Sequence, residues 1–164
     1  MLSASIGDLI NNQIKHELYS AYLYLAMSTY LEAQNYPGAA KWMRSQAAEE
    51  VEHAMKFVDY THDRGGRVTL QAIDQPPSDF GALLDAFQAA LAHEQKVTAL
   101  IHGLYAQAVQ ENDYASQSFL TWFVNEQVEE EKSAGDVVAQ LERIGNNPAA
   151  LFVLDAQLGK RGAD

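Results

Sequence analysis

The stretch AAEEVEHAMKF, residues 47–57, decides how the fold of this chain is interpreted. At the spacing of one helix face, Glu50 is in phase with the apolar residues Ala54 and Phe57. His53 follows Glu50 by three residues, so both side chains lie on one face and can reach a common ligand. Glutamate is rarely buried without a partner, so a glutamate in phase with the core residues of a helix needs a counter-charge if it is buried.

The same pattern recurs in three other segments of the chain. Glu17, Glu94 and Glu130 are each in phase with apolar residues that recur every three or four positions. Gln127 precedes Glu130 by three residues and lies on the same face. Glu17 lies 33 residues before Glu50. Glu94 lies 33 residues before Gln127, so the two halves of the chain repeat one plan.

Helical composition dominates the chain between its turn signals. Four prolines and a few glycines separate long segments that are rich in alanine, leucine, glutamate and glutamine. No strand pattern of comparable length competes, so the predicted fold class is all-α. The sequence predicts a single domain over 1–164, with helices over 5–34, 38–65, 80–111, 114–145 and 149–160 and a crossover over 66–79.

The lengths of the connections predict the topology. Very short turns join the first helix to the second and the third to the fourth, so each pair forms an antiparallel hairpin. A crossover of about 14 residues reaches about 45 Å when extended, whereas a helix of about 27 residues is about 40 Å long. The crossover can therefore run the length of the bundle and make the second and third helices parallel. We expect a four-helix bundle with one long crossover and a short fifth C-terminal helix.

The polar positions on the four core stripes predict a metal site. They lie near the midpoints of their helices, and antiparallel helices meet at their midpoints, so the side chains converge at one level. One acidic run such as residues 49–53 is usually a solvated helix face, but four runs centred on core stripes favour a site. No lysine or arginine lies on the stripes near them, so bound metal is the expected counter-charge. Oxygen ligands with one histidine suit iron, manganese or zinc, and the spacing does not choose among them.

Composition narrows the partners and the compartment. The net charge of −11 repels nucleic acid and anionic membranes and attracts cations. The absence of cysteine excludes disulfide frameworks, zinc–cysteine sites and iron–sulfur centres. No apolar run approaches the roughly 18–20 residues of a membrane span, and the first residues do not resemble a secretory signal. We expect a cytoplasmic protein, with an organelle left open if a transit peptide has been removed.

These motifs resemble those of non-haem ferritins of the bacterial type, within the ferritin-like di-iron carboxylate superfamily. The resemblance covers essentially the whole chain and is carried by residues 49–53, residues 125–130, Glu17, Tyr24 and Glu94. It implies an iron-storage ferritin whose di-iron ferroxidase centre oxidises Fe(II) with dioxygen and passes Fe(III) to a mineral core. It also implies a homo-oligomeric cage of 24 subunits with iron as the cofactor.

The resemblance also implies which residues hold the two iron ions. Glu17, Glu50 and His53 would hold the first ion. Glu94 and Glu130 would hold the second ion, with Glu50 as the bridge between the two.

Further residues would assist the centre. Gln127 would lie beside the ion pair and orient bound oxygen or water. Tyr24 matches a tyrosine that supplies an electron, although it fits a core aromatic residue equally well. Trp122 has the same two interpretations, with packing favoured. The resemblance implies a third iron site formed by Glu49, Glu126, Glu129 and Glu130.

Haem and several other functions are not expected. Val51 stands where bacterioferritins place a haem-ligating methionine, and their second Glu-x-x-His is missing. The complete set of stripe acids disfavours a cage without its own oxidation centre. Ligands within one bundle and a fifth helix disfavour a twelve-subunit DNA-protecting mini-ferritin, and the lack of cysteine disfavours a rubrerythrin-like peroxidase. A purely structural bundle would tolerate acids only outside its core.

Overall fold

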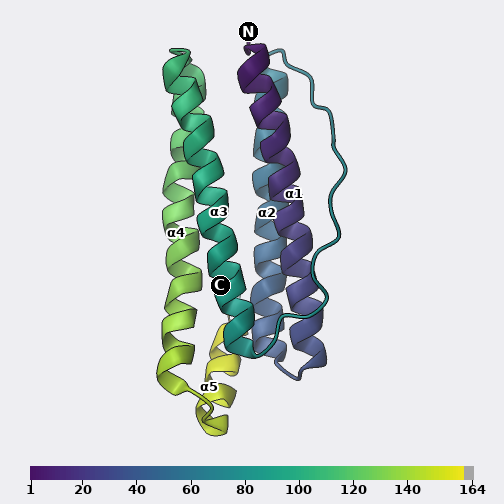
Figure 1. The fold of residues 1–164 in the computed structure, drawn as a ribbon, viewed down its shortest axis with the longest axis vertical. Coiled ribbons are helices and arrows are strands. Elements are labelled where there is room, and N and C mark those ends of the chain that lie inside the picture. The colour runs from purple at the N-terminus through teal and green to yellow at the C-terminus, as the bar shows by residue number, and fades with distance from the viewer. Residues whose placement is uncertain (161–164) are drawn as a thin grey trace.

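A computed structural model of the protein describes residues 1–160 and contains four long helices and one short helix (Figure 1). The all-α prediction and the predicted order of the elements are confirmed. The helices are α1 (Ala4–Ala33), α2 (Pro37–Asp63), α3 (Leu83–Gln110), α4 (Tyr114–Ile144) and α5 (Pro148–Leu158).

Local signals start the helices and reverse the chain between them. The side chain of Ser3 accepts a hydrogen bond from the amide of Ile6 and caps α1, and Asp113 caps α4 in the same way. In the two tight turns, Asn35 and Asn112 have positive φ angles of 62° and 54°. Asparagine tolerates this left-handed conformation better than most residues, so each turn reverses the chain within a few residues. The two expected hairpins follow.

The crossover between α2 and α3 runs along the outside of the bundle beside α1 (Figure 1). Asn11 holds it there, because its side chain accepts from the amide of Thr69 at 2.8 Å and donates to the carbonyl of Arg67 at 3.3 Å. The chain therefore returns to the end at which α2 began, and α2 and α3 run in the same direction. The predicted long crossover and parallel pair are confirmed.

The predicted start of the third helix at residue 80 is wrong by three residues. Gly81 has a φ of +71°, which no residue inside a helix adopts, so α3 begins at Leu83. At this start the carboxylate of Asp85 accepts from the amide of Ala82 at 2.8 Å.

Small corrections apply at other helix ends. The second helix ends at Asp63 rather than 65, because Gly65 already has a φ of +70°. The fifth helix ends at Leu158 rather than 160, and residues 161–164 of the predicted domain lie outside the described residues.

The hydrophobic core is divided into two clusters by a polar layer. One cluster joins the first turns of α2 and α3 to the last turns of α1 and α4, and includes Tyr24, Met43 and Phe87. The other joins the opposite ends of the same helices, and includes Ile10 and Phe57. The stripe acids lie between the two clusters, which is the level that their positions near the helix midpoints predicted.

None of the described helices is long and apolar enough to cross a membrane.

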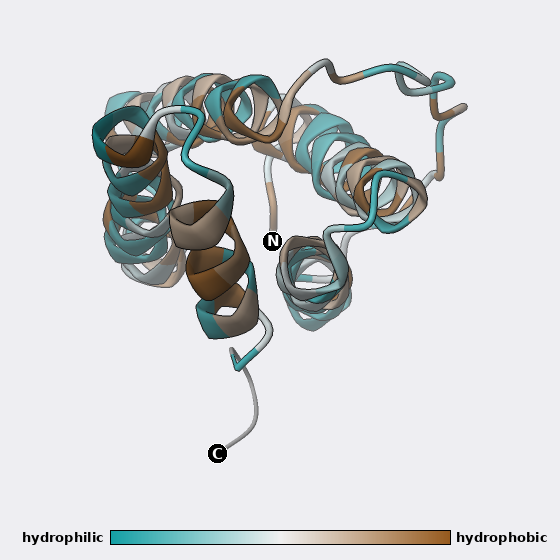
Figure 2. Ribbon diagram, turned by 90° about the horizontal axis from the view of Figure 1, so that it is seen from below, coloured by the Kyte–Doolittle hydropathy of each residue, from teal (hydrophilic) through white to brown (hydrophobic). Residues whose placement is uncertain are grey.

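The short helix α5 crosses the end of the bundle and is largely apolar (Figure 2). Asp155 docks it on α2, because its carboxylate accepts from the amides of Gly38 at 3.1 Å and Ala39 at 2.8 Å. These amides are in the first turn of α2 and have no partner inside that helix, so a carboxylate there is favourable. A Cβ on Gly38 would lie 1.7 Å from the carbonyl oxygen of Asp155, so only glycine allows this approach.

We predict that Gly38→Ala lowers the melting temperature by about 5 °C, because overpacking costs about 1–3 kcal/mol in a domain of this size. The matched control is Gly103→Ala, since an added Cβ at Gly103 in α3 meets nothing within 4 Å. That control should leave stability unchanged or raise it slightly. Thermal unfolding of the metal-free protein measures both variants, and equal melting temperatures would refute the tight docking of α5.

Candidate metal centre

Four glutamates and one histidine, from all four long helices, are buried at the polar layer. Because each helix contributes a stripe position near its midpoint, the folded bundle brings together residues that are far apart in the sequence. Their exposed fractions are 1% for Glu17, 2% for Glu50, 4% for His53, 0% for Glu94 and 4% for Glu130.

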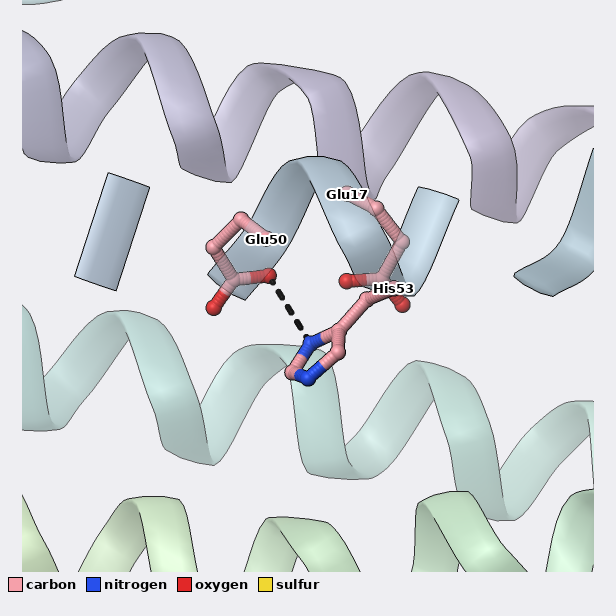
Figure 3. A group of neighbouring side chains, drawn as sticks. All are labelled: Glu17, Glu50 and His53. Carbon is pink, nitrogen blue, oxygen red and sulfur yellow. Dashed lines mark ion pairs between the residues drawn. The ribbon is translucent and has the colours of Figure 1, made fainter. Parts of the chain in front are cut away.

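Glu17, Glu50 and His53 form the first ligand group. One ligand atom from each lies within 4.8 Å of the others, which is close enough for a single metal ion. The side chains point into the space between the helices (Figure 3), and His53 Nδ1 lies 3.4 Å from Glu50 Oε2. Glu17 Oε1 accepts from Gln13 Nε2 at 2.8 Å, whereas Glu17 Oε2 is buried with no hydrogen-bond partner in the described chain. An acceptor in that state fits an absent cation.

His53, Glu126 and Glu130 form the second ligand group. His53 belongs to both groups. Its Nδ1 atom faces Glu50, and its Nε2 atom lies 4.0 Å from Glu126 Oε1. Glu130 Oε2 accepts from Gln46 Nε2 at 2.5 Å. Glu126 is half-buried, so this group lies nearer to the surface than the first group.

Glu94 belongs to neither group but is held firmly beside them. Its carboxylate accepts a short hydrogen bond from the hydroxyl of Tyr24 and a second bond of 3.2 Å from Gln127 Nε2. Tyr24 and Gln127 are themselves buried. The structure therefore brings both assisting residues that the sequence predicted to the side of Glu94.

The site carries more negative charge than its own groups can neutralise. Burial raises the pKa of Glu17 and Glu50 well above the usual glutamate range, and the neighbouring carboxylates raise both further. Burial also raises the pKa of Glu94, and it raises the pKa of Glu130 to about 7 with a contribution from the charge of Glu94. No lysine or arginine is buried in residues 1–160. Without metal the cluster takes up protons, and a cation would displace them.

Other predicted residues lie at the rim of the site. Glu49 is half-buried and Glu129 is exposed, and neither joins the two ligand groups. In the group that contains Glu126 and Glu130, the third side chain is His53 rather than Glu49 or Glu129. Trp122 is 39% exposed and packs edge-on against the His53 ring, with the two centroids 5.4 Å apart.

Gln13, which donates to Glu17, and Gln46 support the site without having been singled out from the sequence. Gln46 is fully buried and donates to Glu130, which lies on another helix. Its position four residues before Glu50 places it on the same face of α2, and that spacing was the available signal.

Comparisons with known proteins agree with this geometry. Residues 7–144 match the family model of the ferritin-like domain. Bacterial non-heme ferritins from Staphylococcus aureus are 38% identical over 164 residues, covering 100% of this chain and 99% of theirs. One from Bacteroides fragilis is 41% identical over 161 residues, covering 98% of this chain and 100% of its own. The open pore ferritin of Archaeoglobus fulgidus superposes with a TM-score of 0.97 at 46% identity, covering 98% of this chain and 99% of its own.

The raised pKa of Glu130 predicts how the stability of the metal-free protein depends on pH. The folded carboxyl titrates near 7 and the unfolded one near 4.5, so the folded state binds the extra proton between these values. Stability is therefore highest below pH 4.5 for this group, falls as the pH rises to 7, and then levels off. The full difference is about 3 kcal/mol.

The variant Glu130→Gln removes this titration, and Gln46 can turn its free Oε1 towards the new amide. Between pH 5 and 8 the melting temperature of the wild type should therefore fall relative to that of Glu130→Gln. Glu142→Gln, an exposed change on the same helix, should show no such trend. A difference between wild type and Glu130→Gln that stays constant with pH would contradict the assignment.

Proposed function

The chain belongs to the ferritin family, and from that premise we propose how its buried carboxylates carry out the iron storage and Fe(II) oxidation of ferritins. Two Fe(II) ions, the substrate, bind at the polar layer, and each gives one electron to dioxygen, which is thereby reduced to the peroxide level. The Fe(III) product then moves to a mineral store. The observation that carries this proposal is the burial of acids from four helices at one level without a lysine or arginine among the buried described residues.

Glu17, Glu50 and His53 hold the first ion in this proposal. Their ligand atoms are mutually within 4.8 Å, and the unpartnered Glu17 Oε2 offers a free lone pair. Two carboxylates and one imidazole suit iron, and anionic oxygen ligands favour the higher charge of Fe(III).

Glu94 and Glu130 hold the second ion, and Glu50 bridges the two ions. The support is electrostatic, since the charge of Glu94 raises the pKa of both Glu50 and Glu130. Three carboxylates that repel one another across a small buried space are in position to share a cation.

Gln127 and Tyr24 assist through their hydrogen bonds to Glu94. Gln127 orients the carboxylate and lies beside the position of the ion pair. The hydroxyl of Tyr24 could supply one further electron to dioxygen as its proton passes to Glu94, which accepts its hydrogen bond.

A third iron site formed by Glu49, Glu126, Glu129 and Glu130 lies towards the surface in this proposal. Glu126 and Glu130 are already in one ligand group, and Glu130 would connect this site to the second ion. The half-buried and exposed positions of Glu49 and Glu129 fit a site that exchanges iron with solvent more readily.

We also propose assembly into a 24-subunit cage. Phe152 and Val153 on α5 are 78% and 56% exposed, which is apolar surface that an assembly contact would cover. The charge of −11 on each subunit would concentrate Fe(II) around such a cage. The proposed compartment is the cytoplasm. No haem is proposed, since the position after Glu50 is the exposed Val51.

The test is to load metal-free protein with two Fe(II) per subunit without oxygen and then expose it rapidly to oxygen. Fast oxidation that saturates near two irons per subunit would support the centre. Oxidation at the rate of the buffer alone would mean that the acids hold another metal or serve only the fold. Gel filtration of the same sample tests the cage.

We predict that Glu50→Ala slows the fast oxidation by at least about 100-fold, because loss of a shared ligand exceeds the 10–100-fold effect of an outer partner. The matched control is Glu52→Ala, which removes an exposed carboxylate two residues away on the same helix. The control should oxidise Fe(II) at the wild-type rate. An unchanged fast phase in Glu50→Ala, in a correctly folded protein, would refute the assignment.

We predict that Glu129→Ala changes the iron stoichiometry or the later turnovers more than the first fast step. The reason is that Glu129 lies at the surface, outside the two groups of buried ligands. Rapid-mixing absorbance with two and then three Fe(II) per subunit separates these phases. A loss of the fast step as severe as that expected for Glu50→Ala would exclude the third site.

A further inference from the structure

Four side chains form a chain of hydrogen bonds between α3 and α4, beside the second ion position. Glu94 and Thr98 are one turn apart on α3, and Gln127 and Glu131 are one turn apart on α4. Gln127 Nε2 lies 3.2 Å from Glu94 Oε2 and 3.2 Å from Thr98 Oγ1. Thr98 Oγ1 in turn donates to Glu131 Oε1 at 2.6 Å.

The carboxylate of Glu131 decides which group donates and which accepts in each of these hydrogen bonds. A carboxylate only accepts hydrogen bonds, so the single hydrogen of the Thr98 hydroxyl points to Glu131. The Thr98 oxygen can then only accept on its other side, and it requires an N–H from Gln127. If the amide of Gln127 turned over, its carbonyl would face acceptors at both Thr98 and Glu94. The amide is therefore held with its N–H groups towards the ligand Glu94.

We propose that Thr98 and Glu131 are positioning residues that hold the Gln127 amide on Glu94 and thereby set the affinity for the second ion. The proposal rests on the proposed function, because it takes Glu94 as a ligand of that ion. Neither residue touches the ion, so both act only through Gln127.

Loss of either residue weakens the hold on the amide, because Gln127 Nε2 then keeps only its contacts to Glu94, at 3.2 Å to the carboxylate and 3.3 Å to the backbone carbonyl. Without Glu131, the Thr98 hydroxyl is also free to donate to the Gln127 carbonyl, which favours the turned orientation of the amide. Its Nε2 then leaves Glu94, and its carbonyl oxygen faces the carboxylate that must hold the cation. A partner of a metal ligand typically contributes 10–100-fold to metal affinity, so a selective loss of this size is expected.

The alternative is that these hydrogen bonds only help α3 to pack on α4. Removal of a hydrogen bond would then lower the melting temperature and leave the two ion positions equally intact. The two interpretations differ in one measurable respect, which is the affinity for the second ion compared with that for the first.

The experiment titrates assembled, metal-free protein with Co(II), following heat and visible absorption. Thr98→Val keeps the shape of the side chain and removes the hydroxyl, and it should weaken the second Co(II) about tenfold and the first less than twofold. Thr98→Ser restores the hydroxyl and should rescue the affinity. Thr121→Val is the matched control, since the Thr121 hydroxyl donates only to a carbonyl of its own helix, that of Gln117 at 2.9 Å.

Variants of Glu131 test the positioning role independently, and they suffice if Thr98→Val fails to assemble. Glu131→Leu should weaken the second ion as much as Thr98→Val, whereas Glu131→Gln keeps an acceptor for Thr98 and should bind both ions normally. The double variant Thr98→Val with Glu131→Leu should be no weaker than either single variant, because both act through one amide.

The possible outcomes distinguish failure of the positioning role from failure of the proposed function. At least two Co(II) per wild-type subunit with no selective loss in Glu131→Leu would overturn the positioning role and leave the proposed function intact. Equal weakening of both ions would also overturn it, because the effect would then be structural. Fewer than two Co(II) per wild-type subunit would overturn the proposed function and this inference together.

Discussion

The rest of the structure depends on the burial of mutually repelling carboxylates at one level of the bundle. Such a cluster is unfavourable in an apolar core unless it binds protons or a cation. Each acid must therefore approach the others from its own helix, and each helix must extend far enough beyond the cluster to bury apolar surface on both sides. The length of the four helices and the position of each acid near the middle of its helix are what this geometry requires.

Glutamine is the residue that holds these acids in place. Gln13, Gln46 and Gln127 each donate to a different carboxylate, namely those of Glu17, Glu130 and Glu94. An amide orients a carboxylate through its N–H without neutralising it, whereas a lysine or arginine would form an ion pair and occupy the position of the cation. The neutral donors therefore fix the geometry and leave the charge available for iron.

Much of this arrangement could be predicted from the sequence because it is periodic. Glu17, Glu50 and Glu94 share the phase of their apolar neighbours, and the helix period then places them in the core. The start of α3 could not be predicted in the same way, since it depends on the positive φ of Gly81 and on a contact of Asp79 with the distant Tyr30.

Contacts between helices lie beyond what periodicity can predict. The hydrogen bond from Tyr24 to Glu94 joins residues 70 positions apart, and that from Gln46 to Glu130 joins residues 84 positions apart. Their formation depends on the rotation and the axial shift of one helix against another. The relation between Thr98 and Glu131 is visible for the same reason only after α3 and α4 have packed.

The division of the core into two apolar clusters has a consequence for the metal-free state of the subunit. Each cluster holds all four long helices together on its own side of the polar layer. The packing of the four helices therefore does not depend on bound metal, so we expect the metal-free subunit to keep the same fold. In the proposed function, iron would therefore enter and leave at a level that has a packed apolar cluster on either side.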